Sequence, residues 1–139
     1  MLDYPAMANE TIPVLRVARP TDQLAVIQRF YQDGLGFELL AQFDNHNGFD
    51  GLILGHRQWP YHLEFTHHRG HMVGKAPSAD NLLVLYFPDE DTWRQQVERM
   101  RAHGFESVAS YNPYWDEWGV TFEDADGYRM VLQQAAWAL

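Results

Sequence analysis

Side chains that could do acid–base or metal chemistry are concentrated in one short stretch, YHLEFTHH, at residues 61–68. Successive side chains of an extended strand point to opposite faces, so His62, Glu64 and Thr66 are expected on one face. A carboxylate beside an imidazole can serve as a general base, or the two can bind a divalent metal together with His67. The structural alternative is a hydrogen-bonded His62 and a solvated loop that holds the histidines that follow.

Glu64 has a structural explanation beside the functional one. A carboxylate on an apolar face must be paired or neutralised, and strand alternation would put Arg16 and Arg129 on its face. Glu64 is then half of an ion pair. In the functional interpretation Glu64 is a base whose pKa is set by these arginines and by burial, suited to proton abstraction beside a carbonyl. The sequence leaves both open.

Aromatic residues are dense in YNPYWDEW at residues 111–118, where two acidic residues lie among them. Such rings suit a flat or cationic ligand through stacking and cation–π attraction. A dimer contact would use them equally well, and core packing would explain one or two. The residues predicted to contact a ligand are Arg16, Tyr86, Tyr111, Tyr114, Trp115, Trp118 and Arg129.

Composition limits the class of protein. The chain has 139 residues, a formal net charge of −9 and no cysteine. The acidic balance argues against nucleic acid or an anionic membrane as partner, and no apolar stretch is long enough for a membrane span. The N-terminal residues do not have the pattern of a secretory signal, so a cytoplasmic location is expected. Without thiolates, a metal would need His, Glu or Asp ligands.

Hydrophobic periodicity and turn residues predict the same order of elements twice, a strand, a helix and three strands. Thr21 and Asp89 are predicted helix N-caps, and Gly34 and Gly104 are predicted stops. The expected strands are 12–18, 37–43, 51–55, 61–66, 82–87, 105–109, 117–123 and 128–134, with helices over 22–33 and from Asp89 to Gly104.

The last strand pair has the clearest turn chemistry. In FEDADGYRMVL, residues 122–132, a hydrophobic strand runs into an acidic Asp-Gly turn and leaves it as a second strand. The carboxylates of Asp124 and Asp126 can bond nearby backbone, and Gly127 accommodates a positive φ. The stretch predicts a β-hairpin.

Four segments in this order, LRVARP, FYQDGLGFELL, HLEFTHH and FEDADGYRMVL, resemble the vicinal oxygen chelate superfamily of glyoxalases, bleomycin-resistance proteins and dioxygenases. The resemblance implies an α+β fold in which two βαβββ modules form a curved, partly closed eight-stranded sheet around a cup, with the helices outside, and it implies a homodimer. We expect a loose leader at 1–11, modules at 12–67 and 81–134, a linker at 68–80 and a tail at 135–139.

The metal-dependent members of that superfamily chelate an ion at four positions, which match Ile12, Glu64, Leu82 and Val131 in this chain. Only Glu64 can donate a lone pair, whereas three or more protein ligands are expected for a catalytic ion. We therefore predict no metal and no cofactor, and a protein that binds a small organic molecule, cationic or aromatic, in the cup.

The alternative is a metal-dependent glyoxalase- or dioxygenase-type enzyme with an atypical site around Glu64 and His62. A third interpretation is a metal-free isomerase or lyase that uses Glu64 as base. The sequence does not decide whether the protein is an enzyme, and it does not identify the ligand.

Overall fold

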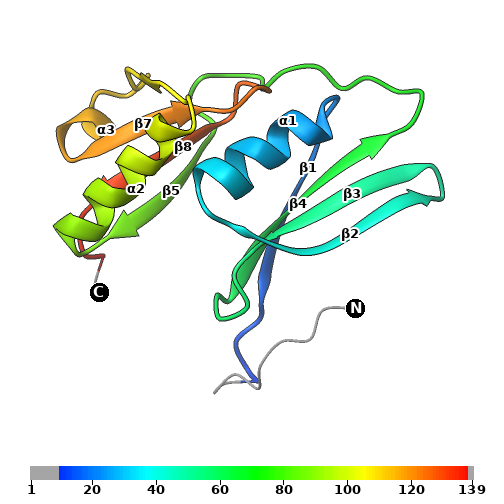
Figure 1. Ribbon diagram of the computed structural model, residues 1–139, viewed down its shortest axis with the longest axis horizontal. Helices are drawn as coiled ribbons and strands as arrows, with labels where there is room; N and C mark the ends of the chain where they lie inside the picture. Colours follow the sequence, from blue (N-terminus) through cyan, green and yellow to red (C-terminus); the bar gives the residue numbers. More distant parts are fainter. Residues whose placement is uncertain (1–9, 138–139) are drawn as a thin grey trace. The chain divides into compact units, whose positions relative to one another are not determined.

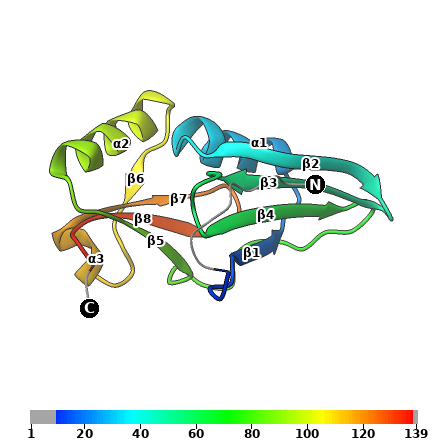
Figure 2. The ribbon, with the colours of Figure 1, turned by 90° about the horizontal axis from the view of Figure 1, so that it is seen from below.

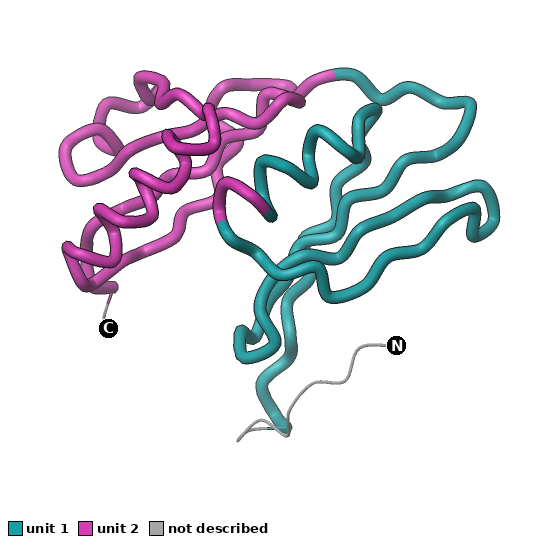
Figure 3. Tube along the Cα trace, in the orientation of Figure 1, with its two compact units in different colours: residues 1–32, 36–74 teal, residues 33–35, 75–139 magenta. Residues whose placement is uncertain are grey.

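The computed structural model of the protein describes residues 10–137. The chain forms two compact units (Figure 3), and each is described by itself. Unit 1 takes its residues from 1–32 and 36–74, and unit 2 from 33–35 and 75–139. Each unit contains one four-stranded sheet.

Unit 1 contains a mixed sheet with the strand order β1-β4-β3-β2 (Figure 1). Strand β1 runs parallel to β4, whereas β3 is antiparallel to both β4 and β2. The helix α1 continues directly into a π-helical turn, η1. The elements are β1 Leu15–Pro20, α1 Leu24–Gln28, η1 Arg29–Gly34, β2 Glu38–His46, β3 Phe49–Gly55 and β4 Tyr61–His68.

The apolar core of unit 1 lies between the helix and one face of its sheet. Ile27, Phe30 and Tyr31 are at most 1% exposed, and the Tyr31 ring packs against Phe65 of β4 with 4.7 Å between the ring centroids. Because strand side chains alternate, Leu63 and Phe65 face the helix, and the even-numbered residues of β4 face the other way. This alternation decides where His62 and Glu64 lie.

Unit 2 repeats the arrangement with the strand order β5-β8-β7-β6, in which β5 runs parallel to β8. The Asp89 carboxylate caps α2 by accepting the Thr92 N–H at 2.9 Å, and the indole N–H of Trp93 donates to the Leu132 carbonyl at 2.8 Å. The elements are β5 Leu82–Phe87, α2 Glu90–Ala102, β6 Ser107–Val108, α3 Tyr114–Glu117, β7 Gly119–Glu123 and β8 Arg129–Gln134.

The turn between β7 and β8 is organised by one carboxylate. Asp124 is 4% exposed, and its Oδ1 accepts the backbone N–H of Asp126 at 2.9 Å and of Tyr128 at 3.0 Å. Gly127 has φ +88°, a conformation that glycine adopts without steric cost. The predicted hairpin is present.

The predicted α+β fold class is confirmed, and hydrogen bonding divides the eight strands into two four-stranded sheets. Strand β5 has the predicted bounds, and Asp89 is the N-cap of α2. Some local predictions were wrong, and one short helix was not foreseen. Strand β1 begins at Leu15 rather than residue 12, Gln23 rather than Thr21 is the N-cap of α1, and the unforeseen helix is α3. None of the helices within residues 10–137 is long and apolar enough to cross a membrane.

Candidate functional site

The face of the unit 1 sheet opposite α1 carries a cluster of three ionisable side chains, Arg16, His62 and Glu64. Strand pairing brings them together, because Arg16 is in register with His62, and Ala18 with Glu64. Arg16 Nε donates to His62 Nδ1 at 3.2 Å, and Arg16 Nη1 lies 3.9 Å from Glu64 Oε1. The predicted proximity of Arg16 to Glu64 is thus present inside unit 1, and we call the three residues the polar cluster.

Burial and charge determine the protonation state of His62. The residue is 4% exposed, and this burial, followed by the nearby Arg16 charge, holds the pKa of His62 below its ordinary value. His62 is therefore neutral at pH 7. Since Nδ1 accepts a hydrogen bond, the ring proton is on Nε2, which makes Nε2 a donor.

The surface around the polar cluster is apolar and closely packed. Ile53 of β3 is in register with Glu64 and is 8% exposed. Next along β3, the Phe43 ring occupies the space above Gly51 that a Cβ would need. Farther along the same face, His68 is stacked between Phe49 and His71, with centroid distances of 4.3 and 3.7 Å.

The structure does not bring His62, Glu64 and His67 together. His67 Nδ1 lies 3.0 Å from the Thr21 carbonyl, since strand alternation turns its ring to the helix side of the sheet. The Nδ1 atom of His62 already accepts from Arg16. Within residues 10–137, no group of three His, Asp or Glu side chains is arranged to hold a metal ion.

The four superfamily metal positions do not fit an ion either. Glu64 has a side chain 18% exposed. Ile12 precedes β1, Leu82 begins β5, and Val131 lies in β8 with no exposed surface. Aliphatic carbons provide no lone pair, so the residues at these positions do not fit a metal ion.

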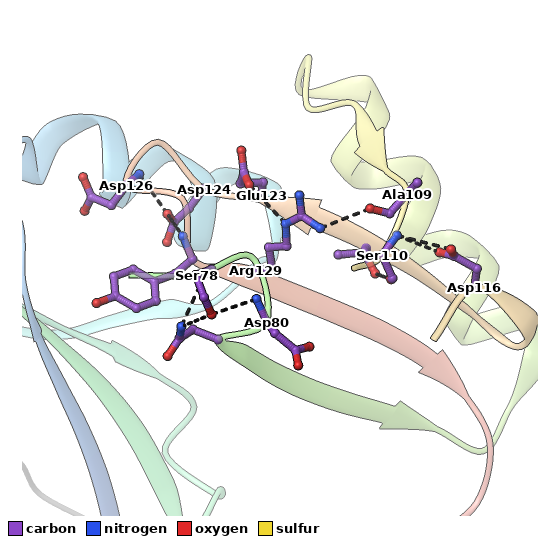
Figure 4. A network of polar contacts seen from close by, with 12 residues as sticks. Ser78, Asp80, Ala109, Ser110, Asp116, Glu123, Asp124, Asp126 and Arg129 are labelled. Carbon is purple, nitrogen blue, oxygen red and sulfur yellow. Dashed lines mark hydrogen bonds and ion pairs between the residues drawn. The ribbon is translucent and has the colours of Figure 1, made fainter. Parts of the chain in front are cut away.

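In unit 2, Arg129 binds groups of its own unit (Figure 4). Its Nε donates to Glu123 Oε1 at 3.1 Å, and its Nη1 donates to the Ala109 carbonyl at 3.1 Å. Only 13% of the Arg129 side chain is exposed. Arg129 therefore fixes the segment after β6 to the sheet.

That segment, residues 109–118, crosses the face of the unit 2 sheet opposite α2, and we call it the strap. In Figure 2, α2 lies above β7 and β8, and α3 lies below them. The Ser110 hydroxyl hydrogen-bonds the buried Thr121 hydroxyl, and the Ser110 N–H donates to the Asp116 carboxylate at 3.1 Å. The Trp115 carbonyl oxygen lies beside Gly119. The strap therefore covers the β7 positions that share a face with Val131.

The aromatic residues of the strap point largely into solvent. Tyr111, Tyr114 and Trp118 are 73%, 63% and 61% exposed, and Tyr86 of β5 is 39% exposed. Trp115 is half-buried and meets Tyr114 edge-on, with 4.9 Å between ring centroids. These exposures argue against core packing of the segment, and they leave contact with a ligand or with a dimer partner as its two other interpretations.

Comparison with known proteins identifies the family. Residues 15–66 match the model of the YycE-like N-terminal domain, and residues 80–134 match that of the YycE-like C-terminal domain. The YycE protein of Bacillus subtilis is 41% identical over 121 residues, which cover 87% of each chain. The chain belongs to the YycE-like family. A crystal structure of a Bacillus subtilis YycE protein of unknown function superposes with a TM-score of 0.81 at 41% identity, over 88% of this chain and 90% of that one.

More distant structures show which fold the YycE-like family has. Leishmania major glyoxalase I gives a TM-score of 0.68 at 20% identity, over 89% of this chain and 87% of that one. An antibiotic-binding protein from a Streptomyces species gives 0.61 at 22% identity, over 96% and 100%. These likenesses confirm the glyoxalase-like fold that the resemblance implied.

Sequence reasoning missed three features of these surfaces. It did not foresee that Arg16 binds His62, although parallel pairing of the first and fourth strands would have suggested it. It did not foresee the strap, because α3 has only four residues. It also overlooked Gln133, which is 4% exposed in β8, and an isolated glutamine near the chain end gives no sequence signal.

Proposed function

We propose that this YycE-like protein binds a small organic molecule on the polar cluster of unit 1 and needs no metal to do so. The observation that carries the proposal is the partly exposed Arg16, which contacts both the neutral His62 and the Glu64 carboxylate on one sheet face. The protein would act by binding and sequestration, and we extend the proposal to a homodimer in the cytoplasm.

The polar cluster offers a defined set of hydrogen-bonding groups. Arg16 has a side chain 40% exposed, so it keeps guanidinium N–H groups for a ligand. Glu64 adds an acceptor, and its side chain is 18% exposed. This set is complementary to a molecule with a carbonyl or acidic oxygen beside a hydroxyl or amine, and Ile53 with the Phe43 ring supports its apolar part.

Arg16 also accounts for how ligand oxygen could be bound without a metal. A guanidinium stays charged throughout the physiological pH range and donates hydrogen bonds in a fixed planar geometry. Its positive charge can therefore stabilise a ligand oxygen, as a bound metal cation would. The lack of lone pairs at Ile12, Leu82 and Val131 supports the same proposal.

The decisive experiment combines elemental analysis with ligand screening. After exposure to zinc, manganese, nickel and iron followed by exhaustive desalting, the protein should retain far less than one ion per chain. A thermal-shift screen of small hydroxyacids, α-hydroxyketones and planar antibiotics should give ligands whose stabilisation is lost in Arg16→Met and kept in Arg94→Met on α2. About one retained ion per chain, or hits that tolerate Arg16→Met, would contradict the proposal.

The exposed strap supports a second part of the proposal, a stacking wall for planar or cationic ligands or for a partner chain. Joint replacement of Trp115 and Trp118 by alanine should weaken the binding of planar ligands to the strap of unit 2, measured by fluorescence separately from the Arg16-dependent ligands. It should leave non-aromatic ligands unaffected. Equal binding of both kinds by the double variant would exclude the stacking wall.

A metal-free catalyst with Glu64 as general base is the second candidate, favoured by the position of this partly buried carboxylate beside Arg16. It predicts turnover of a carbonyl-containing ligand that needs no added metal and is abolished by Glu64→Gln. Ligand binding without turnover would leave the sequestration proposal.

A further inference from the structure

The polar cluster contains one positive and one negative group that do not hydrogen-bond each other. Arg16 Nη1 and Glu64 Oε1 are 3.9 Å apart, which is an ion-pair distance but is longer than the range of about 2.7–3.2 Å for a hydrogen bond. The Arg16 side chain is 40% exposed and the Glu64 side chain is 18% exposed. Both charged groups can therefore hydrogen-bond a third group that comes from solvent.

His62 determines which edge of the Arg16 guanidinium a ligand can reach. Arg16 Nε donates to His62 Nδ1 at 3.2 Å, so the edge that includes Nε is occupied. The edge formed by the Nη atoms remains, and Nη1 lies on the side of Glu64. Because His62 is buried and neutral, its bond holds the guanidinium in place without offsetting the charge. The donor that meets a ligand thus lies next to an acceptor of opposite charge.

These neighbouring charges disfavour a ligand that has only one sign of charge. A carboxylate that accepts from Arg16 would lie close to Glu64, and like charges at such separations repel. An ammonium that donates to Glu64 would be repelled by Arg16 in the same way. The net charge of −9 weakens the binding of a simple anion further. A ligand that carries both charges next to each other avoids both penalties.

We propose that the polar cluster binds a zwitterion of the α-amino acid class, with the ligand carboxylate on Arg16 and the ligand ammonium on Glu64. This inference rests on the binding function proposed above and specifies the ligand class. An α-amino acid carries both groups on one carbon, so protein atoms 3.9 Å apart can each make a hydrogen bond of about 2.9 Å to it. Ile53, in register with Glu64, and the half-buried Phe43 ring provide apolar surface beside the cluster, which favours an apolar ligand side chain.

The test uses two sets of matched probes on the full chain. Phenylalanine is compared with hydrocinnamate, which lacks the ammonium, and with phenethylamine, which lacks the carboxylate. Leucine is compared in the same way with isocaproate and isoamylamine. In ¹⁵N-resolved NMR titrations, at least one of the amino acids should shift the Arg16 Nε–H and Glu64 amide signals saturably. Its affinity should exceed that of both analogues roughly tenfold or more, as expected for one hydrogen bond to a charged group. An analogue that binds equally well, or no response to either amino acid, would overturn the inference.

Variants test the two contacts separately. Glu64→Gln removes the charge at the same size, so amino acid affinity should fall roughly tenfold, whereas the carboxylate analogue should bind as well as before or better. Arg16→Met should weaken the binding of both compounds. The control is Glu98→Gln, an equal change of charge at an exposed position of α2, which should alter neither affinity. Equal losses for the two compounds in Glu64→Gln would assign Glu64 a structural role and contradict its contact with the ammonium.

The results also separate this inference from the proposal on which it rests. If the thermal-shift screen gives hydroxyacid or hydroxyketone ligands that depend on Arg16, while neither amino acid binds, the zwitterion class is wrong and metal-free binding on the cluster stands. If the amino acids bind and Arg16→Met has no effect, their site lies elsewhere and both proposals are wrong.

Discussion

Strands β4 of unit 1 and β8 of unit 2 have equivalent places in their sheets, but one side chain is partly exposed on β4 where a buried one lies on β8. Each is the second strand of its sheet and runs parallel to the first strand of its unit. On β4, Glu64 stays partly exposed beside Arg16. On β8, Val131 is fully buried on the face that the strap crosses. The same topology thus presents a partly exposed carboxylate on one sheet face and a covered aliphatic side chain on its counterpart.

Exchanging the two residue types gives the sharpest test of that difference. Val131→Glu should lower the free energy of unfolding by about 3–5 kcal/mol, because it buries an unpaired carboxylate. Urea denaturation at pH 7 measures the loss. Val131→Leu, a change of size alone, should cost less, about 1–3 kcal/mol. If the Val131→Glu variant were as stable as the parent, the unit 2 face would be as accessible as that of unit 1.

Loosening the strap should have the next largest effect. Arg129→Met removes the hydrogen bonds to Glu123 and to the Ala109 carbonyl, and we expect a loss of about 1–3 kcal/mol. Hydrogen exchange should show faster exchange at Ser110 and Trp115 in particular. The control is Arg94→Met, whose exposed ion pairs on α2 should contribute less than about 1 kcal/mol. Uniform acceleration across unit 2 would contradict a specific anchoring role.

The reverse exchange in unit 1 should be mild. Glu64→Leu removes the carboxylate partner of Arg16, but that guanidinium keeps its hydrogen bond to His62 and remains partly solvated, so stability should change by less than about 1 kcal/mol. Ligand binding on the polar cluster should nevertheless be lost. Thermal-shift titration with a screened ligand compares the two quantities. A large loss of stability would make Glu64 a structural ion-pair residue.

The stability of the folded protein should fall on acidification because His62 is buried in its neutral form. The pKa of His62 in the folded protein lies below the unfolded value of about 6.5. Below about pH 6.5 the unfolded state therefore binds more protons than the folded state, and the free energy of unfolding decreases as the pH is lowered. His62→Asn should reduce the difference between the urea denaturation midpoints measured at pH 7.5 and at pH 5.5. Replacement of the exposed His103 by asparagine is the control. An unchanged pH dependence in His62→Asn would mean that other groups cause it.

Local sequence signals predicted the framework and failed where tertiary contacts decide. The Asp-Gly turn at Asp124 and the cap at Asp89 depend on neighbours within four residues, so their chemistry is visible in the sequence. The bounds of β5 were predicted correctly because its apolar run begins and ends at polar or turn-forming residues next to it in the sequence. Hydrophobic periodicity did not predict the division of the first helix into α1 and a π-helical turn.

The candidate site was only partly predictable. Alternation put His62 and Glu64 on one face, as the structure has them, because the period of two is a local property. That Arg16 binds His62 depends on which strands pair, and that Gln133 lies over Gly119 depends on the register between β7 and β8. No sequence spacing encodes either contact. The modules at 12–67 and 81–134 remain a prediction, and most of the leader at 1–11 lies outside the described residues.

The carboxylate-braced turn between β7 and β8 has a kinetic consequence. Its hydrogen bonds join residues at most four apart, from Asp124 to Asp126 and Tyr128, so closing it costs little loop entropy. Hairpins of this kind form in about 1–10 μs. In unit 2 this hairpin can therefore be ordered before β5 finds β8 across some forty-five residues of intervening chain, and Asp124→Ala should slow refolding more than it speeds unfolding.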